Sequence, residues 1–260
     1  MKESLRNYQV SWYNINLKDA GKLSVLTRPK GQWYANFYKL LFEKYSAYEE
    51  IEQGLIKSKE QTKELIKGKI NLYEAEMVLS FACGVSYIEY LLLKDKAISP
   101  ENLFMYDWSN NSFKIFNKYE FRTRKIVGDF QNSTSILSGI NLVYFTQLFY
   151  SFNLAELEKF LTTFREYGNP NCKYLTTYTS NTNFKKYNFF SLLLKKNWAF
   201  LYPIYSYYIR GRPAQFMGWE RSTEYYEAIL KKNNANILES GQLSSGEKYF
   251  VFLLKRESKQ

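Results

Sequence analysis

Short apolar runs alternate with amphipathic stretches from about residue 75 to residue 178. A continuous apolar run is typical of a buried strand, and apolar positions three or four residues apart are typical of a helix with one buried face. Strand and helix signals that alternate in this way favour a mostly parallel sheet covered by helices, an α/β fold. The expected strands are 75–81, 102–107, 125–129, 140–145 and 173–178, and the clearest helices between them are 87–92 and 154–164.

The alternation stops near the C-terminus. Two more β-type runs, 235–240 and 248–254, are separated only by residues 241–247, which leaves no room for a crossover helix. Adjacent strands with so short a connection pair antiparallel. The pattern therefore predicts a Rossmann-like, seven-stranded, mostly parallel sheet with an antiparallel C-terminal hairpin at one edge.

The first 70 residues have a different pattern of apolar and polar positions. Residues 1 to about 28 are polar and irregular, whereas aromatic and aliphatic residues then recur at helical spacing from Trp33 to Tyr45. A second helical pattern, rich in Lys and Glu, runs from residue 49 to residue 69. We expect residues 1–70 to form an N-terminal helical cap and residues 71–260 to form the main domain.

Composition narrows the chemistry. The chain has no histidine, which excludes Ser-His-Asp triads and histidine metal sites, and its two cysteines are too far apart for a metal cluster, so we expect no metal. Few cysteines and an N-terminus without the apolar core of a signal peptide favour the cytoplasm, and we expect no membrane span. The net charge of +11 fits either a solvated lysine-rich surface or an anionic partner such as nucleic acid.

Three of the expected strands end in residues suited to a nucleotide. The first ends in a turn of small residues, 82–86, which lets backbone N–H groups and a helix N-terminus approach a ligand. Asp107 ends the next strand, 23 residues beyond Gly84, where a carboxylate can accept hydrogen bonds from two ribose hydroxyls. Asp129 ends the third. Each acid alone could be a helix N-cap or a loop carboxylate, but the ordered set favours a nucleotide site.

At these positions the chain resembles the class I S-adenosylmethionine (SAM)-dependent methyltransferases. Residues 78–86 resemble the family's first motif, an acid-x-Gly-x-Gly-x-Gly turn, and residues 106–109 resemble the second, whose acid holds the ribose. Residues 128–130 resemble the third, whose Asp contacts the adenine amino group, and residues 141–150 resemble the fourth, which passes under the methyl donor. The resemblance spans about residues 70 to 260 and implies SAM as the cofactor. The cofactor-binding residues that it implies are Ser80, Ala82, Cys83, Gly84, Ser86, Asp107, Trp108, Asp129, Phe130, Tyr144 and Gln147.

The first motif departs from the family pattern. Ser80 stands where the acid that contacts the methionine amino group usually sits, and Ala82 and Ser86 replace two glycines. Alanine disfavours the positive φ that glycine allows. Asn141 also replaces a frequent Asp, with the same shape but no charge. A catalytically silent member of the family is a hypothesis that these departures leave open.

No specific motif identifies the residues that would act on an acceptor. A sulfonium is already activated, so methyl transfer can rely on alignment and desolvation and needs no histidine. Tyr150, Glu220 and Tyr34 are the candidate bases, and none is favoured by spacing.

A long aromatic segment, 181–234, is expected as a lid over the acceptor side. It carries Arg210 and Arg212 in a compact basic turn that either clamps an anionic group or lies solvated at the rim. The candidate acceptor-binding residues are Tyr150, Arg210, Arg212 and Trp219.

Three functions are consistent with these features. The first is a SAM-dependent methyltransferase for a small polar metabolite, with a sugar or sugar-derivative hydroxyl as the favoured acceptor. The second is an RNA methyltransferase that uses the positive surface. The third is a silent SAM-fold subunit that binds a partner through its aromatic residues.

Overall fold

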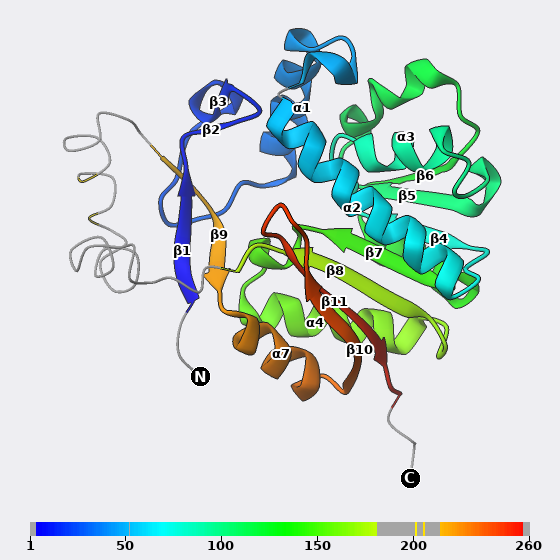
Figure 1. Ribbon diagram of the computed structural model, residues 1–260. Coiled ribbons are helices and arrows are strands. Elements are labelled where there is room, and N and C mark those ends of the chain that lie inside the picture. The colour runs from blue at the N-terminus through cyan, green and yellow to red at the C-terminus, as the bar shows by residue number, and fades with distance from the viewer. Residues whose placement is uncertain (1–3, 52, 181–200, 202–204, 206–213, 257–260) are drawn as a thin grey trace.

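A seven-stranded sheet forms the centre of the protein (Figure 1). The computed structural model describes residues 4–51, 53–180, 201, 205 and 214–256. The strand order is β10-β11-β8-β7-β4-β5-β6. The five strands β8, β7, β4, β5 and β6 are parallel to one another, whereas β11 pairs antiparallel with both β8 and β10. The strands are β4 (Val78–Phe81), β5 (Leu103–Asp107), β6 (Arg124–Val127), β7 (Leu142–Thr146), β8 (Lys173–Tyr178), β10 (Ala235–Gln242) and β11 (Lys248–Leu254). The predicted Rossmann-like sheet and its C-terminal hairpin are confirmed.

Helices cover both faces of this sheet (Figure 1). Along β4, Val78 faces one apolar core together with the first three helices, while Leu79 and Phe81 face a second core with the last two. Successive strand side chains point to opposite faces, so strands buried on both sides read as continuous apolar runs. The helices are α1 (Gly31–Lys44), α2 (Gln53–Leu72) and α3 (Tyr87–Lys94) on the first face, and α4 (Leu154–Tyr167) and α7 (Thr223–Lys232) on the second.

Short 3-10 helices make many of the connections between these elements. One of them, η6, follows β6, and another, η7, follows β7 and leads into α4. Their bounds are η1 (Leu17–Ala20), η2 (Tyr48–Glu50), η3 (Pro100–Asn102), η4 (Asn110–Phe113), η5 (Phe116–Tyr119), η6 (Phe130–Gly139) and η7 (Phe149–Ser151).

The N-terminal segment contains strands as well as helices. Residues that we expected to be irregular form β1 (Ser4–Gln9), β2 (Ser11–Trp12) and β3 (Ile15–Asn16). β1 pairs antiparallel with β9 (Gln215–Arg221), so its partner lies some two hundred residues further along the chain. The local pattern did not reveal this strand, because its hydrogen bonds depend on a distant segment.

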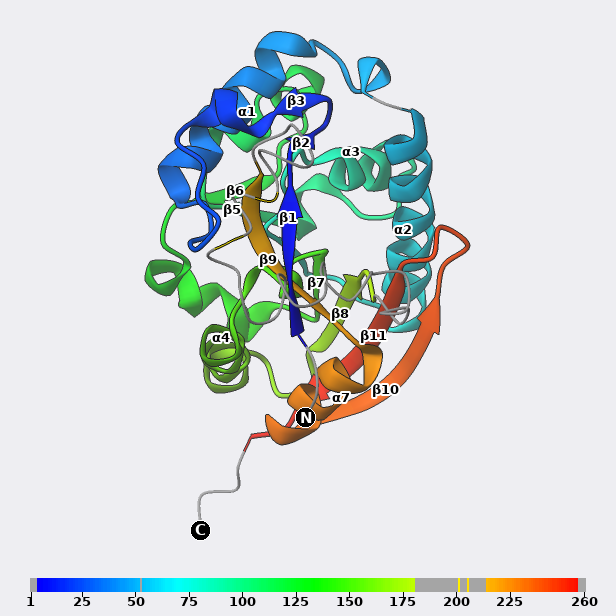
Figure 2. The same cartoon turned by 90° about the vertical axis from the view of Figure 1, so that its left-hand side faces the viewer.

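The β1–β9 ribbon lies across the carboxyl ends of the parallel strands (Figures 1 and 2). Gly218 of β9 has φ +152°, and a Cβ there would lie 2.2 Å from the backbone oxygen of Tyr150 in η7. Glycine therefore permits the close approach of the ribbon to the end of β7. Buried Arg221 reinforces this contact by donating hydrogen bonds to the backbone oxygens of Phe149 and Phe152, at 2.9 and 2.6 Å.

The segment 181–234 has more than one role in the fold. Its described part includes β9, which faces the strand ends, and α7, whose Tyr226, Ile229 and Leu230 are buried in the second core. Arg210 and Arg212 lie outside the described residues. Within the residues that the structure describes, no helix is both long and apolar enough to cross a membrane.

Candidate functional site

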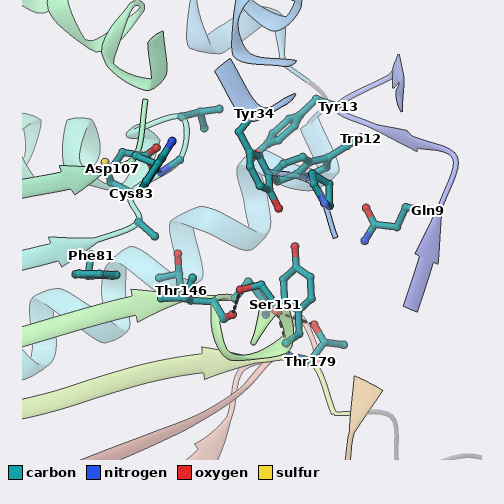
Figure 3. Close-up of a pocket in the computed structure, with 18 of the residues that line it drawn as sticks. Gln9, Trp12, Tyr13, Tyr34, Phe81, Cys83, Asp107, Thr146, Ser151 and Thr179 are labelled. Carbon is teal, nitrogen blue, oxygen red and sulfur yellow. Dashed lines mark hydrogen bonds between the residues drawn. The ribbon is translucent and has the colours of Figure 1, made fainter. Parts of the chain in front are cut away.

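A cavity of about 850 Å³ opens where the parallel strands end, between the sheet and the N-terminal segment (Figure 3). Cys83 and Asp107 lie at one end of it, and Thr146 and Ser151 form part of the side that belongs to β7 and η7. Trp12, Tyr13 and Tyr34 project from the opposite side. The carboxyl edge of a parallel sheet is the usual ligand site in this class of fold.

The turn between β4 and α3 keeps a left-handed backbone despite its substitutions. Ala82, Gly84 and Ser86 have φ values of +57°, +60° and +57°. Ala82, Cys83 and Gly84 line the cavity, whereas the Ser86 side chain is buried behind them. Cys83 N donates to the backbone oxygen of Tyr106, 3.1 Å away, which ties the turn to the end of β5. Alanine and serine thus adopt here the conformation that glycine adopts without strain.

Asp107 is buried at the end of β5 and still borders the cavity. Its Oδ2 accepts a hydrogen bond from Gly84 N at 2.9 Å, and its Oδ1 accepts one from Ser109 N at 3.2 Å. Burial raises the pKa of Asp107 to about 6, and the backbone hydrogen bonds from Gly84 and Ser109 oppose this shift. The carboxylate is therefore fixed in direction and ionised at neutral pH.

Trp108 presents an exposed indole beside this carboxylate. Its exposed fraction is 53%, unusual for so large an apolar side chain. Gly31, the first residue of α1, lies against the indole, and a Cβ at that position would be 1.7 Å from Trp108 Nε1. The absence of a side chain at residue 31 is thus what allows α1 to begin against Trp108, which itself lines the cavity.

Asp129 and Phe130 are not among the residues that line the cavity. Asp129 is exposed and caps η6, accepting a hydrogen bond from Gln131 N at 3.0 Å. Phe130 is buried and packs edge-on against Phe81, with ring centroids 4.6 Å apart. The structure therefore brings Asp107 and the turn together but leaves these two residues at the neighbouring strand end.

The end of β7 contributes a second set of polar groups. Gln147 lines the cavity with φ +52°, and its Oε1 accepts hydrogen bonds from the backbone N and the hydroxyl of Thr179, both at 3.1 Å. Its buried Nε2 has no partner in the described part of the chain. Ser80 and Tyr144 do not line the cavity; both hydroxyls donate to Glu89 in the core beneath the turn.

Six tyrosines line the cavity, and four of them lie outside β5 and α3: Tyr13, Tyr34, Tyr38 and Tyr150. The sequence pattern pointed to only two of these four. Tyr34 and Tyr150 were candidates, whereas Tyr13 and Tyr38 were not. Tyr38 was hidden in the apolar stripe of α1, yet its hydroxyl lies 3.5 Å from where a Cβ on Gly84 would stand. Burial raises the pKa of all four hydroxyls, that of Tyr150 to about 12. They are therefore protonated at neutral pH and act as hydrogen-bond donors rather than as bases.

Strand β9 and the N-terminal segment also supply residues that line the cavity. Trp219 and Glu220 both line the cavity. The guanidinium of Arg28, which the sequence pattern did not single out, stacks 5.5 Å from the Trp219 ring and pairs with Glu156 at 2.5 Å. Its positive charge is thus already partnered within the protein. Across the described residues there is no group of three or more metal-binding side chains.

The backbone conformation of Ala82 yields a direct test of the turn. Replacing Ala82 with glycine should raise the free energy of unfolding by roughly 0.5–1 kcal/mol, because glycine adopts positive φ without the steric cost that alanine bears. Urea denaturation of the two proteins measures the difference. Ala97 has no positive φ, so Ala97→Gly is the matched control and should lower stability; a loss of stability in Ala82→Gly contradicts the left-handed turn.

The chain shares its fold with known proteins but shows no closer relationship to any that was matched. No family model matches the chain, and no curated protein matches its sequence. Among solved structures, the PH0226 protein of Pyrococcus horikoshii OT3 matches with a TM-score of 0.56 and 15% identity, over 84% of this chain and 98% of that one.

Two solved methyltransferases match as well. Magnesium protoporphyrin IX methyltransferase from Synechocystis PCC 6803, solved with bound SAH, has a TM-score of 0.51 and 12% identity, over 78% of this chain and 84% of that one. The mitomycin 7-O-methyltransferase MmcR has a TM-score of 0.52 and 12% identity, over 75% of this chain and 53% of that one. At such low identities the likeness establishes the fold: this chain has the Rossmann-like fold of the class I SAM-dependent methyltransferases.

Proposed function

We propose that this chain is a SAM-dependent methyltransferase that methylates a small polar metabolite, with a sugar or sugar-derivative hydroxyl as the favoured acceptor. The observation that carries the proposal is the arrangement of Asp107 at the cavity. Its buried carboxylate is held by Gly84 N beside the exposed indole of Trp108. This combination offers an acid for a ribose diol and an aromatic face for a base, next to a turn that admits close backbone approach.

The residues present fit the donor in three parts. The Asp107 carboxylate suits the two ribose hydroxyls, the Trp108 indole suits the adenine face, and the turn at Cys83 and Gly84 suits the amino-acid portion. The methyltransferase from Synechocystis that shares this fold was solved with SAH bound, which supports a ligand of this kind. When bound, SAM supplies a methyl group already activated on a sulfonium.

The chain's own contribution to the reaction is alignment of the acceptor with the donor. The β1–β9 ribbon lies across the strand ends (Figure 2), and the cavity beneath it would hold an acceptor against the donor. Among the three candidate bases, Tyr34 and Tyr150 have raised pKa values and keep their protons at neutral pH. Glu220, which also lines the cavity, is the side chain that we assign to accept the proton of the acceptor hydroxyl.

The cavity wall suits a hydroxyl-rich acceptor. The hydroxyls of Tyr13, Tyr34, Tyr38 and Tyr150 make no hydrogen bond to another described residue, and Trp12 and Trp219 add aromatic faces. Phenol hydroxyls can pair with sugar hydroxyls while aromatic faces contact the apolar face of the ring. Arg28 is paired with Glu156, so it does not stand as an unpaired cation for a phosphate.

The two alternatives are less well supported. An RNA acceptor needs access to the strand ends, and the β1–β9 ribbon lies across them (Figure 2). A silent subunit was suggested by the substitutions in the first motif, but Ala82 and Ser86 retain the left-handed conformation that the turn needs. Both remain outcomes of the experiments below.

The cofactor half of the proposal is tested by isothermal titration with SAM and SAH. The wild-type protein should bind both in the micromolar range, and Asp107→Ala should weaken each by at least about tenfold, because the ribose loses a charged hydrogen-bond acceptor. Asp129→Ala is the matched control: this acid caps η6 outside the cavity lining, so its loss should alter affinity much less. If the folded wild-type protein binds neither ligand, the proposed function is wrong and the silent-subunit hypothesis gains support.

Affinity for SAH should depend on pH through Asp107. Its pKa is raised to about 6, and the ionised form is the one that accepts two hydrogen bonds from a ribose. The binding form is therefore complete above about pH 7 and is lost as pH falls through 6, so affinity should drop towards pH 5. Titrations at pH 5, 6, 7 and 8 measure this, and Asp107→Asn, which cannot ionise, should flatten most of the curve. An unchanged affinity from pH 8 to pH 5 contradicts this role of Asp107.

The acceptor half is tested by transfer of radiolabelled methyl groups from SAM to a panel of sugar nucleotides and free sugars, with total RNA as a separate substrate. With the acceptor that the panel identifies, Tyr34→Phe and Tyr150→Phe should each lower kcat/KM roughly tenfold, because each loses one hydrogen bond to the acceptor. SAH affinity should be nearly unchanged in both variants. Salt-sensitive transfer to RNA, with none to the small molecules, overturns the assignment of the acceptor.

A further inference from the structure

A buried carboxylate lies directly behind the turn that lines the cavity. Glu89, in the first turn of α3, is 1% exposed. Its Oε1 accepts hydrogen bonds from two hydroxyls, those of Ser80 on β4 and of Tyr144 on β7, the latter at 2.8 Å. Ser80 and Tyr144 are register partners on neighbouring parallel strands, so both point to the face of the sheet that α3 covers. Three separate elements thus build one polar site within an apolar core.

Helix capping does not account for this glutamate. Ser86 and Glu89 have the S-x-x-E spacing of a capping box, in which the serine caps the helix and the glutamate bonds back to the serine backbone. The Ser86 side chain makes no capping hydrogen bond, and the Glu89 carboxylate reaches the sheet instead. At the start of α4, Asn153 and Glu156 form both halves of such a box. The S-x-x-E spacing therefore does not form a capping box in α3, where the glutamate contacts the sheet.

One oxygen of this carboxylate is unsatisfied. Glu89 Oε2 is buried and has no hydrogen-bond partner among the described residues. A buried ionised carboxylate without a cation is unfavourable, and burial accordingly raises the pKa of Glu89. Lys59, which lines the cavity, is a cation that acts against this shift, while the charge of Glu89 in turn raises the pKa of Asp107 and of Cys83. Glu89 is thus the acid behind the turn, with Lys59 as the cation that opposes the rise in its pKa.

The position of Glu89 indicates which part of a bound donor this charge would meet. Trp108 and Asp107 define the base and ribose end of the cavity at β5. A donor that starts there continues over the turn at Cys83 and Gly84 towards the end of β7. Glu89 lies beneath this second half, where the amino-acid end of the donor and its ammonium group belong.

We propose that Glu89 is a positioning residue whose carboxylate, acting across the turn, provides the negative charge for the ammonium of the donor's amino-acid end. The inference rests on the proposed function. Strand β4 carries Ser80 where an acid would otherwise stand, and the inference assigns the role of that acid to Glu89 of α3. Ser80 and Tyr144 hold the Glu89 carboxylate in place through their hydroxyl groups. The charge acts at short range through a buried medium, where it is screened much less than at a surface.

The test compares three ligands by isothermal titration. SAM and SAH contain the amino-acid portion, whereas 5′-methylthioadenosine has the same base, ribose and sulfur but no ammonium. Glu89→Gln has nearly the same size and should weaken SAM and SAH about tenfold while leaving 5′-methylthioadenosine within about twofold. Melting temperatures establish that each variant is folded. Glu101→Gln, an exposed carboxylate on η3, is the charge-matched control and should not change any affinity.

A relocation experiment separates charge from packing. Ser80→Asp combined with Glu89→Gln returns a carboxylate to the same contact from the strand side and should recover most of the lost affinity for SAM and SAH. Equal weakening of all three ligands by Glu89→Gln, or unchanged binding of SAM and SAH, overturns the inference about Glu89 while the proposed function stands. A wild-type protein that binds none of the three overturns both.

Discussion

The site depends on a backbone constraint at the end of the central strand. Parallel strands β4 and β5 end side by side, and the chain leaving β4 must turn sharply to enter α3 without covering the strand ends. Left-handed residues at Ala82, Gly84 and Ser86 make this turn. The hydrogen bonds from Cys83 N to Tyr106 and from Gly84 N to Asp107 then lock the two strand ends to each other. These two hydrogen bonds fix the direction of the Asp107 carboxylate.

The N-terminal segment completes the cavity through aromatic packing. Trp33 and Trp12 stack on Phe37 of α1 at 5.6 and 4.9 Å, and the Tyr48 hydroxyl donates to the backbone oxygen of Val85 at 2.8 Å. The two ring contacts hold the N-terminal segment together, and the Tyr48 hydrogen bond attaches it to the turn. On the other side, β1 depends on β9, and β9 is anchored by buried Arg221. The side of the cavity that faces β1 and β9 therefore exists only when segments distant in the sequence meet.

The net charge of the whole chain does not describe the ionisable groups around the turn. The sequence carries +11, which by itself suggests a polyanionic partner. Behind and beside the turn, however, the buried ionisable side chains with raised pKa values include two carboxyls, Asp107 and Glu89. Such a site suits a ligand with a positive charge at its amino-acid end, as SAM has. Local burial, rather than net charge, is the more informative quantity here, because surface charges are screened by water and salt.

The sheet and the principal residues at its edge follow from local patterns in the sequence. Continuous apolar runs specify buried parallel strands, and small or acidic residues at their ends mark the ligand edge, since both signals are local. Asp107 and the turn were predicted in this way, whereas Trp108 was implied by the resemblance to the family. Asp107, Trp108 and residues 82–85 of the turn line the cavity. Only the tertiary structure revealed β1, Tyr13, Tyr38 and Glu89. Their roles come from contacts between distant segments, and a strand that pairs with a remote partner, a tyrosine in an apolar stripe and a glutamate at a capping position have no local pattern that distinguishes them.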